Sequence, residues 1–209
     1  KVLKSKTHNK CHFGDLMICG SVWDCPVCAG KISERRRIEL KRAVDQFKSF
    51  GGSVYLITFT YSHKKHDELK ELLVKQSKAM QWFYRHRTYK EIAKRYQKQG
   101  RVRALEVNHG EKNGWHPHLH ELWFLDLHLQ DLETLKLEIH NLWVKACERF
   151  DLGTPSWEHG VDVRGGNDAA DYVAKFGLEE KQESKTWGIE DEITKASSKN
   201  GRMGSRSAF

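Results

Sequence analysis

The 209-residue sequence predicts an α+β fold in which an antiparallel sheet carries its helices on one face. Short segments rich in β-branched and aromatic residues are typical of strands, and longer segments with apolar residues three and four apart are typical of helices. Their order along the chain is strand, helix, strand, strand, helix, strand (βαββαβ), which is the ferredoxin-like or RRM-like pattern. Such a sheet leaves its opposite face free for a functional site.

The first helix is predicted over residues 33–50, where Leu40, Val44 and Phe47 recur at helical spacing. Its other faces are rich in arginine and lysine, which is typical either of a solvated face or of a surface that contacts phosphate groups. A double glycine ends this helix. Residues 54–60 (VYLITFT) then predict a buried strand, because they are β-branched and aromatic.

The second helix is predicted over residues 67–86, and a basic segment with interspersed tyrosines continues to residue 98. Aromatic rings among basic residues suit single-stranded nucleic acid, because nucleobases stack on rings while phosphates pair with cations. After the central strands we expect a helix over residues 131–150, a short strand over 157–163 and a last helix over 168–176.

The central strands are predicted to form a hairpin whose loop, residues 108–115, contains two glycines and two asparagines. Successive side chains of a strand point to opposite faces, so His116, His118 and His120 share one face. Across the hairpin, Glu106 would lie beside them. Imidazoles grouped with a carboxylate predict a metal site, and the alternative is a solvated sheet edge.

Four cysteines fall close together near the start of the chain: Cys11, Cys19, Cys25 and Cys28. The last two form a C-x-x-C pair, which can grip one Zn²⁺ from a single turn, and an upstream pair would complete a tetrahedral structural site. Cys11 is the least certain ligand because His8 and His12 lie beside it. The alternatives are disulfides in an exported protein and a thioredoxin-like redox pair.

The charge balance favours an anionic partner, with nucleic acid first. Lysine and arginine number 36 against 28 aspartate and glutamate residues, which gives a formal net charge of +8. No apolar run approaches the roughly 20 residues that span a bilayer, and no signal peptide is visible, so we expect a cytoplasmic protein without a membrane partner. The first residue is lysine, so we also expect a trimmed chain.

The segment LEV-x-HG-x-x-NGWHPH-x-H around the histidines resembles the metal-binding motif of rolling-circle replication initiators from small bacterial plasmids. Those proteins are HUH endonucleases, named for two histidines that flank a hydrophobic residue, here His118-Leu119-His120. Residues 19–40, CGSVWDCPVCAGKISERRRIEL, resemble the amino-terminal segment of the same family. Residues 172–175, Tyr-Val-Ala-Lys, resemble its Y-x-x-K motif.

The resemblance implies a single-tyrosine nuclease in which Tyr172 attacks DNA and forms a 5′-phosphotyrosine link. Lys175, on the same predicted helix face, could stabilise phenolate or phosphate charge. Asp168 stands where the family usually has a glutamate that activates water for a second cleavage. The catalytic cation, Mn²⁺ or Mg²⁺, would be held by the two histidines of the triplet and a third ligand. Glu106 is preferred over His116 for that third position.

The predicted organisation is a cysteine-rich zinc-binding segment (1–32), an HUH endonuclease domain (33–180) and a polar carboxyl-terminal extension (181–209). The predicted function is nicking of a plasmid or phage origin to start rolling-circle replication. The expected partner is single-stranded or hairpin origin DNA, with a host helicase as a candidate. The alternatives are a non-catalytic zinc-containing nucleic-acid-binding module, a metal-dependent hydrolase without a covalent intermediate, and an HUH transposase or relaxase.

Overall fold

The computed structural model describes residues 1–7, 10–14, 19–21, 25–165 and 206–207. In this part of the chain, no helix combines the length and the apolar character needed to cross a membrane. The predicted helix over residues 168–176 and the extension over 181–205 lie outside the described residues, as do residues 208–209.

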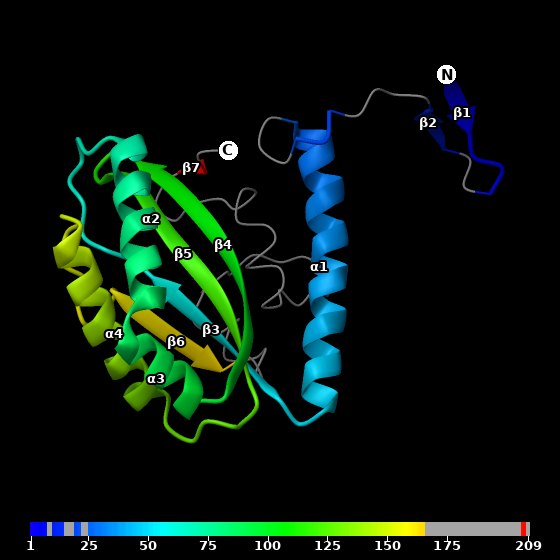
Figure 1. The fold of residues 1–209 in the computed structure, drawn as a ribbon. Helices are drawn as coiled ribbons and strands as arrows, with labels where there is room; N and C mark the ends of the chain where they lie inside the picture. Colours follow the sequence, from blue (N-terminus) through cyan, green and yellow to red (C-terminus); the bar gives the residue numbers. More distant parts are fainter. Residues whose placement is uncertain (8–9, 15–18, 22–24, 166–205, 208–209) are drawn as a thin grey trace.

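A five-stranded antiparallel sheet forms the centre of the described fold (Figure 1). Its strands follow the spatial order β6 (Val161–Gly165), β3 (Ser53–Phe59), β5 (Gly114–Leu125), β4 (Lys98–Gly110) and β7 (Arg206–Ser207). From β3 to β6 the chain order is the predicted ferredoxin-like pattern, with α2 and α3 together in the place of its first helix and with β3 and β5 central in the sheet. The predicted α+β class and antiparallel sheet are confirmed.

One face of the sheet is covered by α2 (Leu69–Arg85), α3 (Arg87–Arg95) and α4 (Leu132–Arg149) (Figure 1). Between them and the sheet lies the main core, which contains Phe59, Phe83, Trp123 and Trp143, all buried. The basic segment after α2 forms a separate helix, because His86 adopts an extended backbone conformation between the two.

The opposite face is only partly free, because α1 (Pro26–Ser49) packs against it (Figure 1). Leu40, Val44 and Phe47 form a second apolar cluster with residues of β3, β4 and β5: Val54, Leu56, Ala104, Leu122 and Phe124. The helix also starts seven residues earlier than expected, since Cys25 caps its first turn and proline occupies its first position. The sequence had not indicated where this helix packs.

The central hairpin is longer than its turn signals suggested. Instead of a loop over 108–115, β4 runs to Gly110 and β5 starts at Gly114, which leaves a three-residue turn. Both glycines and Asn108 are therefore part of the ladder, with Gly110 opposite Gly114 and Asn108 opposite His116, and only Asn113 stays in the turn. The short strand expected over 157–163 lies instead at 161–165, and β1 (Val2–Lys4) pairs with β2 (Cys11–Phe13) in a separate hairpin.

Candidate metal centre

The register of the central hairpin brings three metal-ligating side chains together on the sheet face against which α1 packs. Glu106 of β4 lies directly opposite His118 of β5, and His120 is the next residue on the same face. The Nε2 atoms of His118 and His120 lie 3.2 and 2.9 Å from the same carboxylate oxygen of Glu106. Ligand atoms of all three lie within 4.8 Å of one another.

Neighbouring polar groups orient these side chains. The Thr58 hydroxyl of β3 lies 3.0 Å from His120 Nδ1, and the Asn108 amide donates to the second carboxylate oxygen of Glu106 at 3.0 Å. Such contacts fix the tautomer and direction of a ligand. The pattern of residues 54–60 predicts only a buried strand and does not single out Thr58. Its position opposite His120 in the strand register is what reveals the contact.

His116, the alternative third ligand, lies outside this group of three. It precedes His118 by two residues on the same strand face, with ring centroids 5.2 Å apart. Its Nδ1 lies 2.6 Å from Nε2 of His63, which is in the loop between β3 and α2. Burial, with added repulsion from His118 and His63, lowers the pKa of His116 to about 4. His63 was not singled out from the sequence, because only the tertiary fold brings its loop to the hairpin.

The donor set fits a divalent cation. Two imidazole nitrogens and one carboxylate oxygen suit Mn²⁺, whereas Mg²⁺ prefers shells made entirely of oxygen. The three side chains are largely buried, and they stand on paired strands that hold their spacing. A cation here would also neutralise the Glu106 carboxylate, whose burial is otherwise costly.

Three of the four amino-terminal cysteines form a second candidate metal group: Cys19, Cys25 and Cys28. The sulfurs of Cys19 and Cys28 are 3.6 Å apart, near the separation of about 3.8 Å that tetrahedral zinc–sulfur bonds of about 2.3 Å produce. The backbone N–H of Cys28 donates to Cys25 and lowers the pKa of that thiol. Cys11 lies exposed in β2, outside the group, and all five cysteines are free thiols.

The remaining predicted catalytic residues, Asp168, Tyr172 and Lys175, lie outside the described residues. The last strand before them, β6, lies beside β3, with Val161 opposite Phe59 and Gly165 opposite Tyr55. Their roles stay predictions.

Comparison with known proteins identifies the family. The profile of a family described as "Replication protein" matches residues 16–145, which include the cysteine group, the hairpin and most of α4. The chain belongs to this family. No solved structure matches it.

Two relatives of this replication protein both come from Streptomyces. "Protein rep" of Streptomyces lividans is 30% identical over 210 residues, covering 77% of this chain and 46% of that protein. A Streptomyces cyanogenus protein named "Neomycin resistance protein" is 31% identical over 131 residues, which is 51% of this chain and 30% of that protein. The chain thus spans less than half the length of the relatives it matches.

Proposed function

We propose that this chain contains the nicking centre of a plasmid rolling-circle replication initiator. The observation that carries the proposal is the buried group of Glu106, His118 and His120, set on an antiparallel sheet in a member of a replication protein family. The partner is single-stranded or hairpin origin DNA, which agrees with the net charge of +8.

The reaction is a transesterification at one phosphodiester bond. The phenol oxygen of Tyr172 attacks phosphorus and loses its proton, and the bond from phosphorus to the 3′ oxygen breaks. The products are a 5′-phosphotyrosine link and a strand that ends in a 3′-hydroxyl, which takes up a proton and can prime synthesis. A bound divalent ion supplies charge neutralisation at the non-bridging oxygens.

Residues of the chain would stabilise the phenolate, orient the metal ligands and accept a proton in the second step. The unperturbed pKa of a tyrosine is about 10, so Tyr172 needs stabilisation of its phenolate, and Lys175, three residues later in the predicted helix, supplies a cation. Thr58 and Asn108 hold His120 and Glu106 in the orientation that a ligand needs. Asp168 takes the proton of a water or a second hydroxyl that releases the adduct.

The amino-terminal cysteines would bind Zn²⁺ for structure alone. Cys19, Cys25 and Cys28 supply three thiolates at the start of α1, and Cys11 is the candidate fourth ligand. A region so poor in apolar residues gains its stability from the metal. The zinc then holds the first turn of α1 in place.

The proposal is tested by capturing the covalent adduct. The protein is incubated with Mn²⁺ and a labelled library of single-stranded oligonucleotides, then denatured, and the nucleotide-bearing peptide is located by mass spectrometry. The adduct is expected on Tyr172 and absent from Tyr172→Phe, which should still fold and bind DNA. An adduct on another tyrosine would assign the role of nucleophile to that residue instead of Tyr172. Cleavage that survives Tyr172→Phe would instead favour a hydrolase using bound water.

A further inference from the structure

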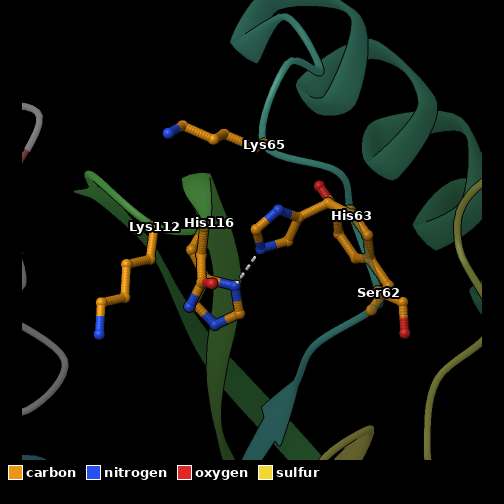
Figure 2. Close-up of a pocket in the computed structure, with 7 residues that line it drawn as sticks. Ser62, His63, Lys65, Lys112 and His116 are labelled. Carbon is orange, nitrogen blue, oxygen red and sulfur yellow. Dashed lines mark hydrogen bonds between the residues drawn. The ribbon is translucent and has the colours of Figure 1, made fainter.

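A cavity of about 330 Å³, whose lining is drawn in Figure 2, lies at the His116 end of the histidine row that also carries the candidate metal centre. Its walls come from two loops that are distant in sequence: the segment after β3, with Tyr61, His63 and Lys65, and the hairpin turn, with Lys112 and Asn113. His116 completes the lining and is two residues before His118 on β5. The cavity and the metal centre are therefore roughly 7 Å apart along one strand.

The two loops are held together at one close backbone contact. Gly114 has a positive φ of 71°, and a Cβ built there would lie 2.2 Å from the carbonyl oxygen of Lys65. The hydrogen-bond contact between His63 and His116, at 2.6 Å, spans the same junction (Figure 2). The cavity is thus built into the packing of the fold.

The chemistry of the lining suits an anion. Lys65 and Lys112 bring two exposed ammonium groups, none of the lining residues is acidic, and neither lysine forms an ion pair with a described residue. The hydroxyl of Tyr61 is buried and has no hydrogen-bond partner among the described residues. Burial raises the pKa of Tyr61, so the hydroxyl keeps its proton and can donate.

A neighbouring cavity of about 310 Å³ provides a useful contrast. It shares Ser62 and His63 with the first cavity, but its lining has three carboxylates, those of Asp67, Glu71 and Asp151, against two lysines, Lys64 and Lys75. Lys75 there is already paired with Asp151 at 2.7 Å. An anion would meet repulsion in this second cavity and attraction in the first, so the two are chemically distinct although they are adjacent.

We propose that the cavity lined by Tyr61, His63, Lys65, Lys112 and His116 binds a backbone phosphate of single-stranded DNA, next to the phosphate held at the metal centre. This inference rests on the proposed function. Adjacent phosphates of a nucleic-acid strand are separated by a distance similar to that between the two sites. The cavity would fix the direction and register of the strand across the histidine row.

The test measures binding of a single-stranded oligonucleotide with a 5′-hydroxyl end, with no divalent metal added, by fluorescence anisotropy at several salt concentrations. Lys65→Gln/Lys112→Gln is compared with Lys78→Gln/Lys145→Gln, two exposed lysines on α2 and α4, the helices of the other face. Both variants lose the same charge. The cavity variant should bind about fivefold to tenfold more weakly, and its salt slope should fall by about 0.7, whereas the control should change less than about twofold. Tyr61→Phe should weaken binding a few-fold.

Equal losses in the two lysine variants would overturn the cavity assignment, as would a wild-type protein that binds no oligonucleotide. Adduct formation by the wild type, measured on the same preparation, reports the proposed function separately. If only the cavity variant loses oligonucleotide affinity and the wild type does not nick DNA, the phosphate site is supported and the proposed nuclease activity is contradicted. Equal affinity losses together with adduct formation by the wild type would support the nuclease activity and contradict the phosphate site.

Discussion

Glu106 is the residue on which the candidate metal centre depends, because its carboxylate is shared by both histidines. Glu106→Gln keeps the shape of the side chain but removes its negative charge. We expect it to weaken Mn²⁺ binding at least about tenfold. A loss of that size is already typical when only a hydrogen-bond partner of a metal ligand is removed. His116→Ala should weaken it less than about threefold, since His116 lies outside the group.

Isothermal titration of each variant with Mn²⁺ makes the comparison directly. Asn108→Ala is a companion variant, because it removes the hydrogen bond that orients Glu106 and leaves every candidate ligand in place; its loss of Mn²⁺ affinity should be smaller than that of Glu106→Gln. A larger loss in His116→Ala than in Glu106→Gln would give the third ligand position to the histidine.

Lys98 should make the unfolding free energy of the protein rise with pH in the alkaline range. Its ammonium donates to the Tyr89 hydroxyl at 3.0 Å and lies 4.7 Å from the centre of the Trp123 ring. Burial lowers its pKa from an ordinary value near 10.5 to about 8, although the nearby Glu121 opposes the shift. Between these two pH values the unfolded chain binds the proton more tightly, so this group makes stability rise with pH.

The measurement is urea unfolding at pH 7.5, 8.5 and 9.5 for the wild type and for Lys98→Met, which keeps the apolar stem. The unfolding free energy of the wild type minus that of Lys98→Met should increase as pH rises. If that difference does not change over this range, Lys98 keeps its ordinary pKa in the fold.

At the scale of elements, the junction between the hairpin turn and the loop after β3 should be sensitive to a single methyl group. Gly114→Ala places a Cβ against the backbone of Lys65 and forces a non-glycine residue into a positive φ. We expect a loss of about 1 kcal/mol or more in unfolding free energy. Gly100→Ala, in the same hairpin with open space around it, should cost less. Equal losses of unfolding free energy in the two variants, measured by urea unfolding, would show that the backbone at this junction can shift at little cost.

The same elements show what the sequence could predict. Strand periodicity was enough to place three histidines on one face and to set Glu106 beside them, because both properties are local. The turn was predicted too long, since asparagine and glycine are loop signals unless a strand partner pairs them, as His116 pairs Asn108. The position of α1 and the approach of His63 depend on tertiary packing, which no local pattern encodes.

At the scale of the whole molecule, the zinc group should stabilise the amino-terminal segment without taking part in the reaction. Metal analysis of freshly purified protein should find one zinc per chain that resists mild chelation, while Mn²⁺ exchanges readily. Cys28→Ser should lose the zinc and lower the thermal midpoint, because the start of α1 loses its anchor. Its affinity for Mn²⁺ at the sheet should not change.

Cys11→Ser is the informative companion variant, because Cys11 lies outside the group of three thiols. Retained zinc in this variant would assign the fourth position to another ligand. A protein purified without zinc, or one with a Cys25–Cys28 disulfide under reducing conditions, would end the zinc assignment altogether.

Both candidate metal groups are compact in sequence, since one falls within residues 19–28 and the other within residues 106–120. A cation at either place would close only a short loop of the chain. The anion cavity differs, because it joins residues 61–65 to residues 112–116. Metal binding would therefore report mainly on one short segment at each place, whereas phosphate affinity would report on the packing of two segments that are distant in sequence.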